Sequence, residues 1–513
     1  MAPAGSGKTT TLVARVAWLV DGGTDPASIT VVAFNKRAAD ELTERLDAAL
    51  APLDVPGGGS RARVVRVRTF HALGREILID AEVAVEPLIE RDDLLRMILP
   101  ASTAAERARL DLAFSRFKLD LRATADDVGR DPAPGPVARA FIAYENAIQE
   151  SGGLDFDDLV VRAVASLGAD PALLARWRTR ASTLLVDEAQ DVDRVQLDLA
   201  LALAAPANDI CLVGDDDQSI YGWRLADVRR ILGLEALLPG LRRIDLEVNY
   251  RCPRSVVERA VRLVEHNDER FAKVIRAGPA AAGRIVLAPD ASDETVRLER
   301  VVRSWPDDGS TRAVLARTNR ELLPAVVIAL RLRLPFRAPR IDLLVESVIV
   351  DVVLGRLADD GRDHLPILIR IGRVRDAADD PAVLEVATAM LGWAVGFADI
   401  TAFEAAIAET RTLLADLRQD DAPLTLATAH ATKGLEFDHV AVIGMEVGRF
   451  PSARAVSQSD DPGRAYEEER RLGYVAWTRA RRSLTLVYDP TVPSPFLLEA
   501  FDPSELGLSP APG

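Results

Sequence analysis

Cysteine is scarce in this sequence, which contains two, Cys211 and Cys252, among 513 residues. Two cysteines give neither the pairing pattern of a disulfide framework nor the ligand spacing of a zinc site. Such scarcity is typical of proteins that work in the reducing cytosol. We therefore expect a cytoplasmic protein.

Long apolar runs are also lacking. A membrane-spanning helix needs about 18 consecutive apolar residues. The most apolar stretch, residues 343–354, is interrupted by Glu346 and Asp351. The first residues are rich in glycine and polar groups, which argues against a secretory signal. We expect no association with a membrane.

An excess of positive charge is missing as well. The chain has 63 basic and 78 acidic residues, a net charge of −15. This balance argues against a protein that wraps nucleic acid electrostatically over its whole surface. It leaves room for a motor that grips a few nucleotides in a local groove. Charge alone favours an ATPase that does not bind nucleic acid, and the motifs below overrule that interpretation.

The length and the 48% hydrophobic content predict three or four domains with sizeable cores. Strand-like and helix-like runs alternate, which indicates a parallel α/β fold. Residues 81–181 and 346–420 read as mostly helical, 52–59 as a surface loop and 491–513 as a loose tail. The expected strands are 31–34, 64–67, 183–186, 210–213, 285–287, 313–315, 424–427, 440–443 and 484–487.

Residues 2–9, Ala-Pro-Ala-Gly-Ser-Gly-Lys-Thr, fit a phosphate-binding loop with alanine in place of the leading glycine. Small residues let backbone N–H groups surround phosphate oxygens, and the helix expected to follow points its positive end at the same anion. Lys8 would reach the β- and γ-phosphates of ATP, and Thr9 would bind Mg²⁺. The alternative, a chance Gly/Ser turn, does not explain the Lys-Thr pair followed by a helix.

An expected buried strand ends in two carboxylates, Asp187 and Glu188. Mg²⁺ prefers oxygen ligands, so Asp187 is the candidate metal ligand. Glu188 can orient and deprotonate the water that attacks the γ-phosphate. Alone, such a pair is usually a solvated loop. Downstream of a phosphate loop it is far more specific.

Residues 214–224, Gly-Asp-Asp-Asp-Gln-Ser-Ile-Tyr-Gly-Trp-Arg, follow another expected strand. Gln218 can sense the γ-phosphate. Tyr221 and Trp223 can stack on bases, which is worth about 1–3 kcal/mol per base. The alternative is that both rings belong to the core, the commoner fate of such side chains.

Two arginines occur in later motifs. Arg251 ends the triplet Asn-Tyr-Arg, and Arg479 lies in residues 475–480, Val-Ala-Trp-Thr-Arg-Ala. An arginine supplied across a cleft can stabilise the charge of a transferring phosphoryl group. Each arginine alone would more often be a surface residue. Between them, residues 428–437 (Thr-Ala-His-Ala-Thr-Lys-Gly-Leu-Glu-Phe) join two expected strands.

Taken in order, these motifs resemble the UvrD/Rep/PcrA branch of the superfamily 1 helicases. The resemblance spans residues 1 to about 490. Residues 153–159 (Gly-Leu-Asp-Phe-Asp-Asp-Leu) are also similar to a segment of that family. The matching segments are 4–9, 33–39 (Ala-Phe-Asn-Lys-Arg-Ala-Ala), 69–74 (Thr-Phe-His-Ala-Leu-Gly), 186–191 (Val-Asp-Glu-Ala-Gln-Asp), 214–221, 249–251, 433–437 and 475–480.

The resemblance implies two RecA-like P-loop NTPase cores with inserted helical domains. The first core would comprise 1–80 and 182–238, with an insert at 81–181. The second core would comprise 239–345 and 421–490, with a reduced insert at 346–420. A 491–513 tail would follow. The implied activity is ATP-dependent 3′→5′ movement on single-stranded DNA and unwinding at single-strand/duplex junctions, in DNA repair or recombination.

The resemblance also assigns residues. Glu188, Gln218, Arg251 and Arg479 would be catalytic, and Mg²⁺ would be held by Thr9 and Asp187. Tyr250 would stack on adenine, and Glu436 would approach the ribose or the metal. ATP would be bound by these two and by Ala4, Gly5, Ser6, Gly7, Lys8, Thr9 and Thr10. The DNA track would be lined by Phe34, Asn35, Phe70, His71, Tyr221, Trp223, Arg224 and His430. His71 and His430 have a simpler alternative as hydrogen-bonded interior residues.

The sequence departs from the family pattern before the phosphate loop. Family members carry there a strand and a glutamine that contacts adenine, which the printed sequence does not include. We expect such a chain, through a misassigned start or as a fragment, to have weakened nucleotide specificity and slow ATP turnover. The insert at 346–420 is about half the family's usual size, which favours translocation over strand separation. Leu225 stands where the family commonly has glycine.

Other classes remain as alternatives. A catalytically impaired DNA-binding or regulatory module would lack DNA-stimulated ATPase activity. The motor half of a helicase–nuclease would need a nuclease on a separate chain. An RNA helicase of the DEAD type is disfavoured, because the carboxylate motif reads Asp-Glu-Ala-Gln and that class has no counterpart of the aromatic segment.

Overall fold

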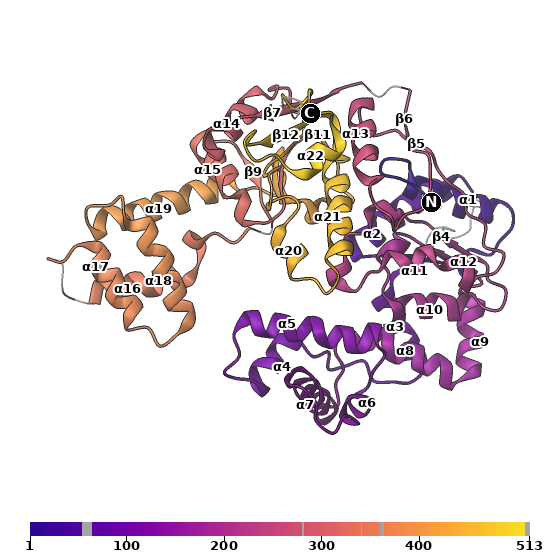
Figure 1. Cartoon of the computed structure of the whole chain (residues 1–513). Coiled ribbons are helices and arrows are strands. Elements are labelled where there is room, and N and C mark those ends of the chain that lie inside the picture. The colour runs from indigo at the N-terminus through magenta and orange to yellow at the C-terminus, as the bar shows by residue number, and fades with distance from the viewer. Residues whose placement is uncertain (54–63, 280–281, 340, 360, 362–363, 508–513) are drawn as a thin grey trace. The chain divides into compact units, whose positions relative to one another are not determined.

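The computed structural model describes residues 1–53, 64–279, 282–339, 341–359, 361 and 364–507. Most of the loop expected at 52–59 therefore lies outside the described residues. The chain divides into two compact units. The first comprises Met1–Ala281 and Gln458–Thr478, and the second comprises Ala282–Ser457 and Arg479–Gly513. Figure 1 gives the element labels.

The first unit contains a parallel four-stranded sheet in the order β2-β1-β3-β4. Val31 at the centre of β1 aligns with Val67 of β2 and with Leu185 of β3. Strands β1 and β3 are buried along their whole length, as expected of parallel strands with both faces covered. The strands are β1 (Ile29–Ala33), β2 (Arg66–Thr69), β3 (Thr183–Val186) and β4 (Ile210–Leu212).

Helices cover both faces of this sheet because neighbouring strand residues point to opposite sides. Val31 packs in one core with Leu12 of α1 and Leu42 of α2. Val32 packs in another with Leu73 of α3 and Leu199 of α10. The helices are α1 (Lys8–Asp21), α2 (Lys36–Leu50), α3 (Phe70–Asp80), α10 (Arg194–Ala204), α11 (Val228–Leu232) and α12 (Leu234–Leu237).

A helical insert lies between β2 and β3 in the sequence. Its small core includes Leu95, Phe114 and Phe141. Local signals set its helix ends: a Thr103/Glu106 capping box starts α5, and Gly152 ends α7 in a left-handed conformation. The helices are α4 (Arg91–Ile98), α5 (Ala104–Ser115), α6 (Ala125–Gly129), α7 (Pro136–Ser151), α8 (Asp158–Ala169) and α9 (Pro171–Arg180).

Residues 239–281 and 458–478 also pack within the first unit, although the sequence assigned them to the second core. Short strands β5 (Val248–Asn249) and β6 (Arg276–Ala277) pair in parallel. Helix α13 (Arg254–Val264) packs against α21 (Pro462–Trp477). The contact between α13 and α21 joins these two segments. It is long-range in sequence, so no local pattern predicts it.

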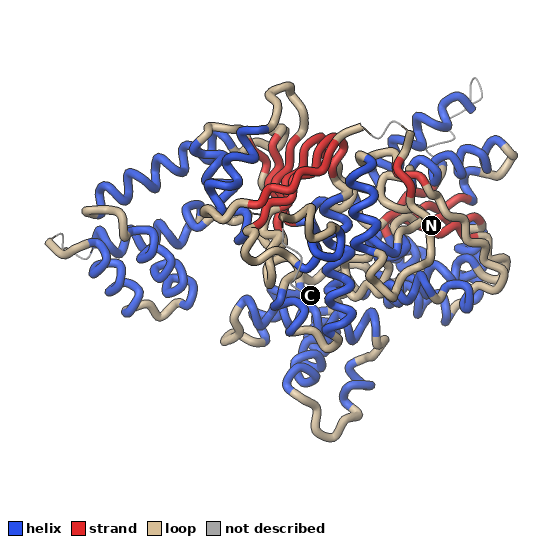
Figure 2. The backbone as a smooth tube through the Cα atoms, turned by 45° about the horizontal axis from the view of Figure 1, so that its top comes forward, coloured by secondary structure: helices blue, strands red, loops and turns tan. Residues whose placement is uncertain are grey.

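The second unit is built on a parallel six-stranded sheet in the order β7-β12-β11-β8-β10-β9. Its strands are among those drawn in red in Figure 2. Val314 of β8 and Val440 of β11 are fully buried near the middle of the sheet. The strands are β7 (Arg284–Pro289), β8 (Arg312–Ala316), β9 (Phe336–Arg337), β10 (Leu424–Thr428), β11 (Phe437–Val442) and β12 (Ala480–Tyr488).

One continuous core joins this sheet to the second helical insert, in which α17 and α16 both pack on α18. The insert helices are α16 (Val348–Asp359), α17 (Ile367–Asp376), α18 (Pro381–Ala394) and α19 (Ile400–Leu417). The remaining helices of the unit are α14 (Glu294–Ser304), α15 (Leu323–Arg331), α20 (Ala453–Ser457) and α22 (Pro495–Ala500).

The α/β fold class predicted from the sequence is confirmed. All nine expected strands are present, with ends shifted by a few residues. The loose tail predicted from residue 491 is wrong for α22. Ser494 caps this helix by accepting the N–H of Phe496, and proline at the first position suits a helix start. Phe496 is fully buried and meets Phe450 edge-on at 6.0 Å between centroids.

No helix within the described residues combines the length and apolar character needed to cross a membrane.

Candidate functional site

The phosphate loop curls over the start of α1. Gly7, at φ +85°, is the last residue before the helix, and the N–H of Thr11 bonds to its carbonyl at 2.8 Å. The hydroxyl of Ser6 donates to the carbonyl of Pro3 at 2.7 Å and closes the loop. No side chain caps the first turn of α1. Its N–H groups therefore form the positive end that suits a phosphate.

Lys8 and the two threonines after it open this helix. The Nζ of Lys8 donates to the carbonyl of Ala2 at 3.1 Å and lies 4.0 Å from Asp215 Oδ2. The lysine is thus folded back along the loop, between backbone oxygen and a carboxylate. Thr9 and Thr10 lie in the first turn, where the Thr9 hydroxyl is a hard oxygen donor suited to Mg²⁺.

The Asn-Tyr-Arg segment packs directly on the phosphate loop. The N–H of Tyr250 bonds to the Gly5 carbonyl at 2.9 Å. A Cβ placed on Gly5, whose φ is +64°, would lie 2.6 Å from Arg251 Cβ and 2.7 Å from Asn249 Oδ1. Tyr250 is 71% exposed. Glycine at this position thus allows Arg251 to lie beside the loop. The contact of Arg251 with phosphate stays a prediction.

Asp187 and Glu188 follow the end of β3. Asp187 is buried, and its Oδ1 accepts the N–H of Glu188 at 3.0 Å. Glu188 has a φ of +50°, a strained conformation for a residue with a side chain and one that often marks functional sites. Its carboxylate accepts from Gln190 Nε2 at 2.5 Å. The oxygen donors of Asp187 and Thr9 are chemically suited to a magnesium ion.

The acidic turn of Asp215, Asp216 and Asp217 follows β4. The amide of Gln218 donates to the Asp215 carboxylate, and the Asp215 N–H donates to Gln190 Oε1 at 2.9 Å. Gln190 therefore links Glu188 to the turn that carries Gln218.

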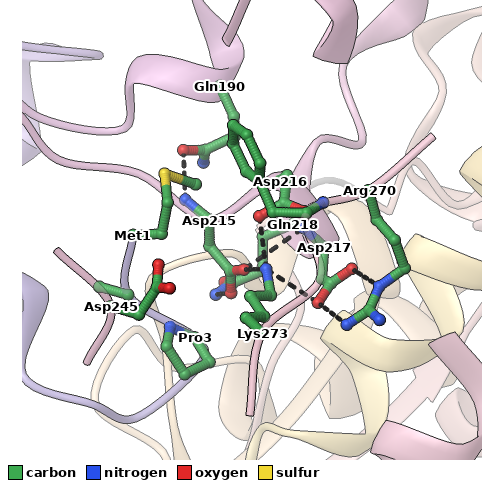
Figure 3. Close-up of polar contacts among 12 residues, drawn as sticks. Met1, Pro3, Gln190, Asp215, Asp216, Asp217, Gln218, Asp245, Arg270 and Lys273 are labelled. Carbon is green, nitrogen blue, oxygen red and sulfur yellow. Dashed lines mark hydrogen bonds and ion pairs between the residues drawn. The ribbon is translucent and has the colours of Figure 1, made fainter. Parts of the chain in front are cut away.

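Two basic side chains from the loop after α13 neutralise this turn (Figure 3). Lys273 Nζ contacts all three carboxylates, and Arg270 forms two 3.0 Å bonds to Asp217. Burial raises the pKa of Asp215, but Lys273 and Lys8 outweigh it and hold that pKa at about 2. Burial and the neighbouring Asp217 raise the pKa of Asp216.

A row of aromatic rings begins three residues after Gln218. Phe34 and Tyr221 are stacked, with centroids 5.2 Å apart and planes at 13°. Trp223 meets Tyr221 edge-on at 6.1 Å and is 49% exposed. The guanidinium of Arg224 lies 4.6 Å from the Trp223 ring centroid. Trp223 therefore has an open face, whereas a core ring would not.

A second stacked pair lies where α3 meets the insert. His71 stacks on Phe156 at 4.0 Å with planes at 19°, and Phe156 is 55% exposed. Burial lowers the pKa of His71 to about 4, although Asp157 and Asp155 oppose the shift. His71 is therefore a neutral imidazole at pH 7.

Two residues predicted to line a DNA track have structural roles in this fold. Phe70 is 4% exposed and belongs to the hydrophobic core around Val32. The prediction that its ring faces DNA is wrong for this structure, because the first turn of α3 directs the ring inward. Asn35 is exposed, but its Oδ1 caps α2 by accepting the N–H of Ala38 at 2.9 Å.

The remaining predicted site residues lie in the second unit. Arg479 is buried, and its Nη1 donates to the Leu435 carbonyl at 3.0 Å. Neighbouring Glu436 is exposed and pairs with Arg481 at 3.5 Å. Burial and Arg317 lower the pKa of His430 to about 3. The Lys-Gly-Leu-Glu-Phe segment thus adjoins Arg479 in this unit.

Sequence reasoning missed several residues of the site. Gln190 and Phe156 lie inside recognised segments, and Tyr474 directly precedes residues 475–480, but none of the three received a role. Tyr474 is buried, and its hydroxyl accepts the N–H of Ala4 at 3.3 Å. Lys273 and Arg270 lie in residues 266–273, which match no motif. Nothing in the local sequence marks them, since only the fold brings them to the acidic turn.

Comparison with known proteins agrees with this geometry. Residues 1–239 match the UvrD/REP helicase N-terminal domain, and residues 401–490 match the UvrD-like helicase C-terminal domain. The chain belongs to the UvrD/REP helicase family. Similar proteins include DNA helicase II of Escherichia coli, 27% identical over 96% of this chain and 82% of its own length. The ATP-dependent DNA helicase PcrA of Staphylococcus epidermidis is 26% identical over 94% of this chain and 80% of its own length.

Within this helicase family member, Gly5→Ala should weaken nucleotide binding. The new Cβ would displace Arg251, and the residue would also carry the backbone strain of a left-handed alanine, about 1–3 kcal/mol. We expect a higher Kd for a fluorescent ATP analogue and a lower Tm. Gly23→Ala is the matched control, because Gly23 has a φ of +92° but nothing within 4 Å of a Cβ. Equal effects of both variants on Kd would show that the contact between Gly5 and Arg251 does not contribute to nucleotide binding.

Trp223→Ala should weaken binding of single-stranded DNA. Loss of one base–aromatic stack costs about 1–3 kcal/mol, which corresponds to a Kd increase between about fivefold and about 150-fold. Fluorescence anisotropy with a labelled oligothymidine measures this Kd. Trp18→Ala is the control, since Trp18 is an exposed tryptophan of α1 (64% exposed) outside the predicted DNA contacts. An unchanged Kd for Trp223→Ala would show that the Trp223 ring does not contact DNA.

Proposed function

We propose that this chain is an ATP-dependent DNA helicase that moves 3′→5′ along single-stranded DNA and opens duplex at single-strand/duplex junctions. Its family and the names of its relatives support this activity. We further propose a role in DNA repair or recombination in the cytoplasm. One observation supports a coupling of ATP hydrolysis to movement on DNA. The turn that holds Gln218 against Asp215 leads, three residues later, to Tyr221, whose ring stacks on that of Phe34.

In the proposed hydrolysis, ATP phosphates lie in the loop of Gly5 to Thr10, and the adenine rests on the exposed ring of Tyr250. Thr9 and Asp187 would hold Mg²⁺, which would offset charge on the phosphates. Lys8 exchanges its contacts with Ala2 and Asp215 for phosphate oxygens. Glu188 accepts the proton of the attacking water.

Charge that develops on the γ-phosphate must be stabilised for this step. Arg251 is already beside the phosphate loop, and we assign Arg479 the same role from the second unit. Gln218 would sense the γ-phosphate, with Glu436 near the ribose or the metal. Because Gln218 and the aromatic row share one turn, loss of the γ-phosphate would shift the rings that hold the bases.

The proposed DNA contacts are stacking contacts on an acidic protein. Phe34, Tyr221 and Trp223 offer ring faces, and Arg224 adds positive charge over Trp223. The His71–Phe156 pair extends this set. We propose that His430 also contacts DNA. Stacking tolerates any base sequence, which suits movement along DNA.

The proposal is tested with purified wild-type chain. ATP hydrolysis is measured with and without single-stranded DNA, and unwinding is measured on duplexes with a 3′ or a 5′ single-stranded tail. We expect DNA-stimulated hydrolysis and unwinding of the 3′-tailed duplex. DNA binding without stimulated hydrolysis would identify the alternative, an impaired DNA-binding or regulatory module. Preference for the 5′ tail would refute the polarity.

Glu188→Gln should retain ATP binding and lose turnover. Glutamine keeps the shape of the side chain but cannot accept the water's proton, and general-base catalysis contributes about 10²–10⁴-fold. Steady-state hydrolysis and binding of a fluorescent ATP analogue measure the two effects. Glu44→Gln, at an exposed position of α2, is the control. Normal turnover by Glu188→Gln would refute the role of this carboxylate.

A further inference from the structure

Three consecutive carboxylates lie buried next to the lysine of the phosphate loop. The side chains of Asp215, Asp216 and Asp217 have no exposed surface, and Asp215 Oδ2 is 4.0 Å from Lys8 Nζ. A nucleoside triphosphate is strongly anionic, so adjacent carboxylates oppose its binding unless other groups neutralise them. They also compete with the phosphates for Lys8.

Lys273 meets this requirement. Its side chain is 2% exposed, and its Nζ lies 2.9 Å from both Asp215 Oδ1 and Asp217 Oδ2 and in closer contact with Asp216. Figure 3 shows the ammonium group at the centre of the three carboxylates. Burial lowers its pKa, but the carboxylates outweigh burial and raise the pKa above its usual range. Lys273 is therefore a permanent cation at this position.

The contacts form a formally neutral set. Lys273, Arg270 and Lys8 contribute three positive charges to the three carboxylates. When phosphates take Lys8, Lys273 and Arg270 remain to neutralise the turn. Without Lys273, Asp215 would draw Lys8 away from the phosphates.

Lys273 is also linked to the two side chains proposed to act at the γ-phosphate, Gln218 and Glu188. It holds one oxygen of Asp215, whose other oxygen accepts from Gln218. The backbone of Asp215 is bonded to Gln190, which in turn bonds to Glu188. A single buried ammonium thus supports both the γ-phosphate sensor and the proposed general base.

The loop that carries Lys273 is itself fastened to α21. Glu467 of α21 accepts the N–H groups of Asp268 at 2.9 Å and Glu269 at 3.2 Å. The same helix carries Tyr474, which touches the phosphate loop. Lys273 is therefore held in place from a distant part of the sequence, as a group with a positioning role requires.

We infer that Lys273 is a positioning residue of the nucleotide site: it neutralises the Asp215–Asp217 turn, which leaves Lys8 available to the phosphates and sets the orientation of Gln218. This inference rests on the proposed ATP-dependent function and deepens it. Lys273 does not touch nucleotide and acts through Asp215.

A purely structural role is the competing explanation, and the chain offers a matched control for it. Lys118 in the helical insert is equally buried, and its Nζ contacts Glu145, Asp155 and Asp158 at 2.8–2.9 Å. Removal of either lysine leaves buried carboxylates uncompensated and destabilises the fold. Only Lys273 lies beside the phosphate loop.

The test compares Lys273→Met, Asp216→Asn, the double variant and Lys118→Met in the full chain. The Kd for a fluorescent ATP analogue with Mg²⁺ is measured without DNA, and Tm is measured in parallel. For Lys273→Met we expect a Kd increase of about tenfold, the effect of one charge-assisted contact. The double variant, which removes one negative charge as well, should recover most of the affinity. Lys118→Met should lower Tm and leave Kd unchanged.

Asp216→Asn alone keeps the inference testable if Lys273→Met does not fold. It retains an oxygen to accept the Phe271 N–H, which now bonds to Asp216 at 2.8 Å, and it should bind the analogue at least as tightly as wild type. An unchanged Kd for folded Lys273→Met, no recovery in the double variant, an equal loss in Lys118→Met, or weaker binding by Asp216→Asn would each overturn the inference. Failure of the proposed function would look different: wild type would bind nucleotide but show no DNA-stimulated hydrolysis.

Discussion

Parallel strands end at one common edge, and in the first unit that edge carries nearly all of the candidate chemistry. Phe34 follows β1, His71 lies two residues past β2, Asp187 follows β3, and the acidic turn begins just beyond β4. The buried pairing of β1 with β2 and β3 fixes these positions relative to one another. Residues as far apart in sequence as Phe34 and Tyr221 stack because their strands share this edge.

Close backbone contact extends the site beyond the strand ends. Gly5 admits Arg251 and Asn249 to the phosphate loop, and Tyr474 of α21 accepts the N–H of Ala4. Such contacts tie segments from both ends of the sequence into one unit. They also explain why the first compact unit includes residues 458–478, because these residues pack on the loop and on the acidic turn rather than forming a separate layer.

Electrostatics determine how an acidic chain can hold anions. The negative charge next to the phosphate loop is gathered in Asp215–Asp217 and matched there by Lys273 and Arg270. At the proposed DNA contacts, stacked rings and one guanidinium over Trp223 would take the place of a broad basic surface. The net charge of −15 therefore says little about either site, because local pairing, not the total, sets the field that a ligand meets.

The sequence by itself determined the α/β class, the nine longer strands, the phosphate loop, the carboxylates after β3 and the family. These features are local: a buried strand, a glycine-rich turn or a helix start is encoded within a few residues. The tertiary structure decided that Phe70 faces the core, that residues 495–500 form a buried helix, and that α13 and α21 belong to the same compact unit as the first sheet. It alone brought Lys273 and Arg270 to the acidic turn. Partners separated by more than 50 residues carry no local signal, and only packing of the whole unit selects them.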